Sequence, residues 1–289
     1  RLTGGEPLLR PDFAELYLYI KKLGIKVLLF TTATLINDEL VQLFKKYPPG
    51  EFVEVTVYGM TQKSYESVTR VKGTFEQAFR GMNLLLQHEI PFVVKSAILP
   101  QNKQDIPAFE EWAKTVPWMT RKPRYSMFYD LRNRRDSGQK NDLIEKIRMS
   151  PDEGLAFITR DPEAYREDMQ QFCAKFTAPP GDKLFSCGAG KKSGTIDAYG
   201  HFQVCMLVRH PDTLYDLRAG SLADALDNFF PNVLATKATN NDYLRKCAKC
   251  FLKGVCEQCP GKAWTEYGTL DTPVSYLCEI AHKQARFLG

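Results

Sequence analysis

Hydrophobic and polar positions in the first 130 residues follow two different periods. Apolar residues recur at helical spacing in four segments, residues 11–23, 38–47, 74–86 and 106–116. Short apolar or alternating runs, typical of strands, separate them at residues 25–30, 52–59, 91–99 and 124–129. Strands that alternate with helices predict an α/β fold with a parallel sheet. Right-handed connections would curl four such strands into a partial (β/α) barrel, because a complete barrel needs more strands.

Local signals place the ends of several of these elements. Pro11 suits the first position of a helix, and Gly24 suits the residue that ends it. Asn37 is a good N-cap for the second helix. Thr74 and Gln77 have the spacing of a capping box at the start of the third helix.

The character of the sequence changes twice after the predicted sheet. Residues 131–150 are polar and rich in Arg, Asp and Asn, which predicts a surface loop or bridge. After about residue 180 helical periods become fewer, and a hairpin is predicted around Gly200, which takes a positive φ easily. We therefore expect three parts: a partial barrel over residues 1–135, a bridging segment over 136–180 and a cysteine-rich domain over 181–289.

Composition and charge narrow the classes of protein. A chain of 289 residues with 44% hydrophobic and 25% charged residues is long and apolar enough to fold around real cores. The net charge of +5 is spread along the chain, so we expect no nucleic-acid partner. No apolar run approaches the roughly 20 residues of a membrane span, so we expect a soluble, cytoplasmic protein with no membrane partner. The four histidines are isolated and are not expected to be ligands: His88, His201, His210 and His282.

All eight cysteines lie at residue 173 or later: Cys173, Cys187, Cys205, Cys247, Cys250, Cys256, Cys259 and Cys278. A chain of this size does not need disulfides for stability, and Cys-x-x-Cys pairs make poor structural disulfides. Such pairs are typical of metal sites, because a tight turn lets two thiolates converge. Two zinc sites and two four-iron clusters both satisfy the count, and the spacing within the motif leaves both open.

The order of the cysteines closely resembles the SPASM extension of radical S-adenosylmethionine (radical SAM) enzymes. Cys187 is followed by twelve residues, Gly200, four residues and Cys205; the later cysteines read C-x2-C-x5-C-x2-C from Cys247, and Cys278 completes the set. The family has three residues, not two, between the last pair of that run, Cys256 and Cys259.

The resemblance implies two auxiliary 4Fe-4S clusters. Cys187, Cys205 and Cys259 would hold the first cluster, and the second would be held by Cys247, Cys250, Cys256 and Cys278. Cys173 would complete the first set or is a buried free thiol. Without it, one iron is left open to bind substrate directly.

The stretch LTGGEPLLRP, at residues 2–11, resembles the GGEP motif of the same enzymes. That resemblance implies that Gly4, Gly5 and Glu6 bind the amino group of SAM. Four further positions carry over. Thr31 and Thr32 lie in a turn where the family has a Thr-Asn-Gly-Thr-like sequence; Thr56 matches a hydroxyl that contacts SAM; and Arg70 matches an arginine that meets the SAM carboxylate. The plain alternatives are a β-branched strand residue for Thr56 and a solvated charge for Arg70.

The family's catalytic cluster is held by a CxxxCxxC motif upstream of GGEP, and this sequence has no cysteine before Cys173. We expect that segment to precede Arg1, so that the chain as given does not cleave SAM. The resemblance implies an enzyme that forms a 5'-deoxyadenosyl radical from SAM with three 4Fe-4S clusters in total. Its substrate would be a ribosomally synthesised precursor peptide or protein, modified by thioether or other crosslinks, and a flavodoxin or ferredoxin would supply electrons.

Two alternatives remain at this stage. A radical SAM enzyme acting on a tetrapyrrole or small cofactor precursor fits the same motifs. A non-catalytic iron-sulfur or zinc protein explains the cysteines but leaves the GGEP stretch as coincidence. No catalytic acid or base stands out: Asp130 and the Arg-rich residues 131–136 face the substrate in one interpretation and form a solvated loop in the other.

Overall fold

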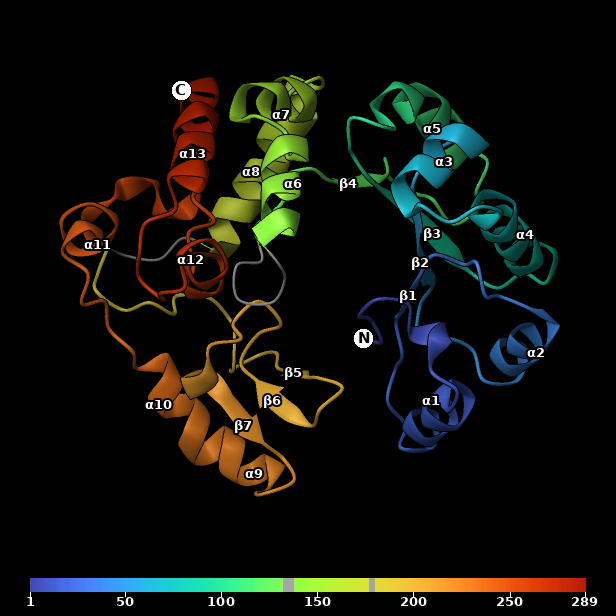
Figure 1. The fold of residues 1–289 in the computed structure, drawn as a ribbon, viewed down its shortest axis with the longest axis horizontal. Coiled ribbons are helices and arrows are strands. Elements are labelled where there is room, and N and C mark those ends of the chain that lie inside the picture. Colours follow the sequence, from blue (N-terminus) through green and yellow to red (C-terminus); the bar gives the residue numbers. More distant parts are fainter. Residues whose placement is uncertain (132–137, 177–179) are drawn as a thin grey trace. The chain divides into compact units, whose positions relative to one another are not determined.

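The computed structural model describes residues 1–131, 138–176 and 180–289, which form two compact units, Arg1–Met127 and Phe128–Gly289 (Figure 1). Nearly all of the Arg-rich segment 131–136 lies outside the described residues. The three-part division into residues 1–135, 136–180 and 181–289 stays a prediction.

The first unit is built on a parallel four-stranded sheet, so the predicted α/β fold is confirmed. The strands lie in sequence order: β1 (Leu29–Thr31), β2 (Val53–Val57), β3 (Phe92–Ala97) and β4 (Arg124–Ser126). The helices of this unit are η1 (Pro7–Leu9), α1 (Phe13–Lys22), α2 (Asp38–Lys46), α3 (Gln62–Thr69), α4 (Thr74–Gln87), η2 (Lys103–Asp105) and α5 (Ile106–Ala113). Asn37 caps α2 as predicted, because its side chain accepts a hydrogen bond from the Leu40 N–H at 2.9 Å.

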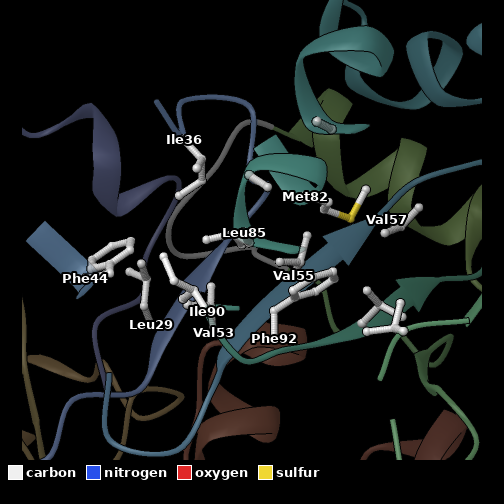
Figure 2. Packing of buried hydrophobic residues seen from close by; sticks show 14 of the residues in the cluster. Leu29, Ile36, Phe44, Val53, Val55, Val57, Met82, Leu85, Ile90 and Phe92 are labelled. Atoms are coloured by element: carbon white, nitrogen blue, oxygen red, sulfur yellow. The ribbon is translucent and has the colours of Figure 1, made fainter. Parts of the chain in front are cut away.

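One face of the sheet packs against the helices and forms the core of the first unit. Val53, Val55 and Val57 alternate along β2 with half-buried residues and are themselves almost fully buried. Figure 2 shows them packed with side chains from the neighbouring strands and from α2 and α4, such as Phe44 and Met82. Each fully buried aliphatic side chain contributes about 1.5–3 kcal/mol, so this face holds the sheet to its helices.

The other face of the sheet is polar. Glu54 of β2 forms an ion pair with Lys95 of β3, and the Lys95 ammonium lies 4.6 Å from the centroid of the Phe30 ring. The strands thus alternate between a side that packs in the core and a side that carries charged residues.

Two predicted element ends are wrong in the first unit. α1 begins at Phe13, and Pro11 lies in the turn before it, where the Phe13 N–H donates to the Arg10 carbonyl at 3.1 Å. The strand expected at residues 25–30 is shorter and later, at Leu29–Thr31. It starts where Leu2 bridges to Leu29 and where Leu29 pairs with Val53 of β2.

The capping box predicted at Thr74 is also wrong. Gly73, with φ +81°, is the N-cap of α4, and its N–H donates to the Glu66 carboxylate at 2.6 Å. The Thr74 hydroxyl instead donates to the Val71 carbonyl at 2.7 Å. A capping box does form one helix earlier, between Thr61 and Ser64 of α3.

In the second unit, residues 138–147 form a helix where the sequence predicted a loop or bridge. The unit begins with α6 (Gly138–Ile147), α7 (Pro151–Ile158) and α8 (Pro162–Phe176). A capping box between Ser150 and Glu153 starts α7, and α7 packs against α13 (Ser275–Leu288). The polar composition of 131–150 hid α6 because its helical period carries few apolar residues.

The cysteine-rich part contains a small antiparallel sheet of β5 (Thr195–Ile196), β6 (His201–Gln203) and β7 (Leu214–Asp216). The predicted hairpin is confirmed, and Gly200 has φ +83° in its turn. The remaining elements are η3 (Pro211–Thr213), α9 (Leu222–Asp224), the π-helix η4 (Ala225–Phe229), α10 (Phe230–Leu234), α11 (Asn241–Arg245), η5 (Cys247–Lys249), η6 (Phe251–Gly254) and α12 (Pro260–Tyr267). None of the helices in the described residues is long and apolar enough to cross a membrane.

Candidate cofactor sites

The Glu6 carboxylate is fixed by four hydrogen bonds at the carboxyl end of β1. Its Oε1 accepts from the Thr31 hydroxyl at 2.8 Å and from the Leu8 N–H at 3.2 Å. Its Oε2 accepts from the N–H and the hydroxyl of Thr32, both at 2.7 Å. The bridge from Leu2 to β1 brings residue 6 beside the end of this strand. Ligands of open parallel sheets bind at this edge, outside the carboxyl ends of the strands.

The two glycines before Glu6 leave an open stretch of backbone. Gly4 has φ +142°, which side chains with a Cβ rarely adopt, and both Gly4 and Gly5 are exposed. A Cβ built on either glycine meets no heavy atom of the described residues within 4 Å. A ligand can therefore approach the main chain of this loop directly, while Pro7, buried at the start of η1, stiffens its exit.

Two tyrosines that the sequence did not single out lie near Glu6. Burial raises the pKa of Tyr58, and the negative charge of Glu6 adds to the effect. Burial likewise raises the pKa of Tyr65, with smaller effects from Tyr58 and Glu6. The rings of Tyr58 and Tyr65 meet edge to face at 5.8 Å. The available signal was the sequence VTVYG, because Tyr58 directly follows β2 and so lies at the ligand-binding edge of the sheet.

Thr56 and Arg70 are placed differently from the Glu6 group. Thr56 is half-buried on the polar face of β2, opposite Lys95 in register. Arg70 is exposed at the end of α3, with φ 57°, and its N–H donates to the Glu66 carbonyl at 2.8 Å. Within the part of the chain that the structure describes, neither side chain hydrogen-bonds to Glu6.

Three thiols lie around that of Cys256 in the second unit. Burial is the main cause that raises the pKa of the Cys256 thiol to about 11, and the charges of Cys278, Cys247 and Cys250 contribute to the rise. The Gln258 N–H donates to the Cys256 sulfur at 3.4 Å. Cys247 begins η5, Cys250 directly follows it, and Cys278 lies on α13, so distant segments supply this group.

The thiols of Cys259, at the start of α12, and of Cys205 form a second group. Cys259 is the N-cap of this helix, and its sulfur accepts a hydrogen bond from the Lys262 N–H at 3.4 Å. Burial is the main cause that raises the pKa of the Cys259 thiol to about 11, with a smaller contribution from the charge of the nearby Cys205. The helix start thus supplies backbone N–H groups to a buried sulfur.

The remaining two cysteines, Cys187 and Cys173, belong to neither of these two groups of neighbouring thiols. Cys187 is exposed in the loop before β5, and Cys173 is half-buried on α8, where its charge contributes to the raised pKa of Tyr165. Among the described residues, no three His, Cys, Asp or Glu side chains are close enough to hold a single metal ion. Thiolates that bind different irons of one cluster stand farther apart than the ligands of a single ion.

Charged residues next to Cys259 form a group that the sequence indicated only through Asp130. The Lys262 ammonium lies 2.5 Å from the Glu257 carboxylate and 3.8 Å from that of Asp130. Nearby, the Glu266 carboxylate accepts hydrogen bonds from Arg148 at 2.8 Å and from the Leu131 N–H at 3.0 Å. Asp130 is therefore neither a solvated loop residue nor isolated.

Residues 1–113 match the family described as the radical SAM superfamily. The match identifies residues 1–113, the part of the chain with the first three strands of the parallel sheet, as a radical SAM domain. Among curated proteins, the "AdoMet-dependent heme synthase" of Methanosarcina barkeri (strain Fusaro / DSM 804) is 29% identical over 115 residues, 40% of this chain and 33% of that protein.

A second relative matches far more of the chain. The "Antilisterial bacteriocin subtilosin biosynthesis protein AlbA" of Bacillus subtilis (strain 168) is 24% identical over 272 residues, 89% of this chain and 55% of that protein. The chain thus spans between a third and about half of the length of these two relatives. Among solved structures, "Native anSMEcpe with bound AdoMet and Cp18Cys peptide" has a TM-score of 0.65 at 12% identity, over 99% of this chain and 81% of that one. At this identity the likeness concerns the fold.

Proposed function

We propose that this protein is a radical SAM enzyme of the SPASM type that modifies a ribosomally synthesised peptide or protein. The observation that carries the proposal is the gathering of thiols in two groups, Cys247, Cys250, Cys256 and Cys278 in one, Cys205 and Cys259 in the other, in a chain that also carries a radical SAM domain. We assign the first group to one auxiliary 4Fe-4S cluster. The second group, with Cys187 and with Cys173 as fourth ligand, is assigned to the other.

The residues present fit such clusters. Buried thiols ionise with difficulty, and bound iron offsets that cost because its positive charge stabilises the thiolates. The N–H groups of Gln258 and Lys262, each 3.4 Å from a cysteine sulfur, supply the hydrogen bonds that tune such centres. The spread of ligands over η5, α12 and α13 ties the folding of the cysteine-rich part to cluster binding.

The first unit would bind SAM through its own residues. Glu6, held by Thr31 and Thr32, would accept the ammonium group, and the open backbone at Gly4 and Gly5 would lie against the methionyl part. Thr56 and Arg70 are proposed to contact the rest of SAM. When bound and reduced by one electron, SAM would supply methionine and the 5'-deoxyadenosyl radical, which would take a hydrogen atom from the substrate. A third cluster, held by a CxxxCxxC motif outside these 289 residues, belongs to the proposal.

The share of this chain that each relative matches favours a peptide substrate over a tetrapyrrole or small cofactor precursor. The match to the heme synthase covers 40% of this chain, whereas that to AlbA covers 89% and takes in part of the cysteine-rich unit. The fold likeness to peptide-bound anSMEcpe covers 99%. Thioether or other crosslinks in a precursor peptide, with a flavodoxin or ferredoxin as reductant in the cytoplasm, complete the proposal.

The cluster assignment is tested by anaerobic reconstitution of the chain, followed by quantification of iron, sulfide and zinc. We expect about eight irons and eight sulfides, as for two Cys-ligated four-iron clusters. Cys256→Ser and Cys259→Ser should each lose about half of the iron, and the double variant should lose nearly all of it. A colourless protein with about two zinc ions would overturn the assignment in favour of a zinc scaffold.

SAM binding is tested by calorimetry on the reconstituted protein with Glu6→Gln. This variant keeps the shape of the side chain and removes the charge that meets the ammonium group. Since a hydrogen bond to a charged group contributes about 1.5–3 kcal/mol, affinity should fall about tenfold to a hundredfold. Glu51→Gln, at an exposed glutamate of the same unit, is the matched control and should bind like the wild type. Equal affinity in both variants would remove Glu6 from the site.

The peptide substrate is tested by mass spectrometry after anaerobic incubation of the full-length enzyme with SAM, a reductant and candidate precursor peptides. Each crosslink removes two hydrogen atoms, so the peptide mass falls by that amount. Conversion of a tetrapyrrole with no change in any peptide would overturn the peptide assignment.

A further inference from the structure

Lys262 is a buried cation beside a thiol that we assign to a cluster. It lies on α12, three residues after Cys259, and its side chain is only 10% exposed. Its own N–H donates a hydrogen bond to the Cys259 sulfur at 3.4 Å. Lysine is almost never buried to this extent without partners.

Two carboxylates hold the Lys262 charge in place. Glu257, which lies between Cys256 and Cys259, contacts the ammonium at 2.5 Å and is 59% exposed. Asp130 lies 3.8 Å from the same ammonium and is 23% exposed. These two ion pairs offset the cost of burying the Lys262 charge.

The remaining charges near this group are already paired. Glu266 also lies on α12 and is 4% exposed, but its carboxylate is bound by Arg148 and by the Leu131 N–H. Arg148 in turn lies 4.0 Å from the centroid of the Tyr276 ring. Of the two cations of this group, Arg148 and Lys262, it is Lys262 whose residue contacts a cysteine sulfur.

We propose that the charge of Lys262 raises the reduction potential of the cluster assigned to Cys259 and Cys205. The carboxylates of Glu257 and Asp130 limit this rise. This inference rests on the proposed cluster assignment. Reduction adds one electron from a low-potential one-electron donor, breaks no bond and makes the centre more negative by one unit. A cation in a low-dielectric setting stabilises that added charge more than the same cation in water does. Lys262 is therefore a positioning residue for electron transfer and touches no substrate.

The test is an anaerobic redox titration of the reconstituted chain, followed by electron paramagnetic resonance. Lys262→Met should shift the reduction equilibrium of one of the two clusters at least tenfold toward the oxidised form, a potential about 59 mV lower. Lys262→Arg keeps the charge and should stay within about threefold of wild type. Lys192→Met removes an exposed lysine near Cys187 and should also stay within about threefold, because water screens its charge.

A second variant, expected to shift the potential in the opposite direction, tests the proposal if Lys262→Met fails to fold. Glu257→Gln, at an exposed position, removes a negative charge and should shift the same cluster toward the reduced form. The proposal is overturned if Lys262→Met keeps its iron and its potential, or if Glu257→Gln shifts the potential downward. Absence of iron from the wild type overturns the cluster assignment itself, whereas full iron content with unmoved potentials overturns only the role of Lys262.

Discussion

Removal of the Glu266 carboxylate should destabilise the second unit, because it breaks a buried ion pair. Glu266 is 4% exposed, and Arg148, its partner at 2.8 Å, is 15% exposed. The same carboxylate oxygen also accepts from the Leu131 N–H at 3.0 Å. Glu266→Ala therefore leaves a guanidinium and a backbone N–H without their partner in an environment that water reaches poorly.

The structure sets the size of the effect. Two hydrogen bonds to a charged acceptor contribute about 1.5–3 kcal/mol each, and breaking a buried ion pair from one side costs about 3–5 kcal/mol. Part of the Arg148 charge is still stabilised by the Tyr276 ring at 4.0 Å, so we expect a loss of about 3 kcal/mol. Arg148→Met with Glu266→Leu removes both charges at similar volume and should recover most of this loss.

Hydrogen exchange of the α12 backbone, measured by mass spectrometry, reports the loss of stability around Glu266. A local measurement is needed because the two units need not unfold in a single transition. Glu266→Ala should speed exchange in α12 about a hundredfold or more, because ~3 kcal/mol corresponds to that factor. Glu163→Ala, at an exposed glutamate of α8, is the control and should exchange like the wild type. A loss below about 1 kcal/mol, or a double variant no better than the single one, would refute the buried-pair reasoning.

Two further predictions concern packing and pH. Gly81→Ala puts a Cβ 2.0 Å from the Ala33 carbonyl oxygen, so overpacking of about 1–3 kcal/mol should outweigh the roughly 1 kcal/mol that Ala gains in a helix. Gly138→Ala meets no atom of the described residues within 4 Å and should be neutral or stabilising; urea unfolding measures both. The Arg218 side chain and backbone N–H hold the pKa of Asp216 at about 2, so their contribution to stability is present above the ordinary pKa of about 3.9 and is lost as pH falls through 2. An NMR titration should find this low pKa, and Arg218→Ala should move it toward the ordinary value; an unchanged pKa would contradict the contact.

The sequence by itself predicted the elements whose signal is local. The alternation of helix and strand periods gave the parallel sheet of the first unit, and Asn37 gave the start of α2 correctly because a cap bonds within its own turn. The hairpin at Gly200 was predictable for the same reason. Motif spacing pointed to the Glu6 loop, since Gly4, Gly5 and Glu6 are contiguous.

Other features depended on contacts between distant residues. The short β1 follows from its bridge to Leu2, and the start of α4 from the bond between Gly73 and Glu66. α6 was missed because a helix with few apolar residues carries little period in its sequence.

The charged group beside Cys259 shows most clearly what only the tertiary structure decided. Asp130, Glu257 and Lys262 are scattered over 130 positions, and each alone resembles an ordinary surface charge. Folding buries the Lys262 ammonium and brings two carboxylates to it, so that its charge acts through a medium of low dielectric. Sequence spacing determined which cysteines belong to one motif, but the electrostatic surroundings of their sulfurs arise only when α12 packs against the segment that carries Asp130.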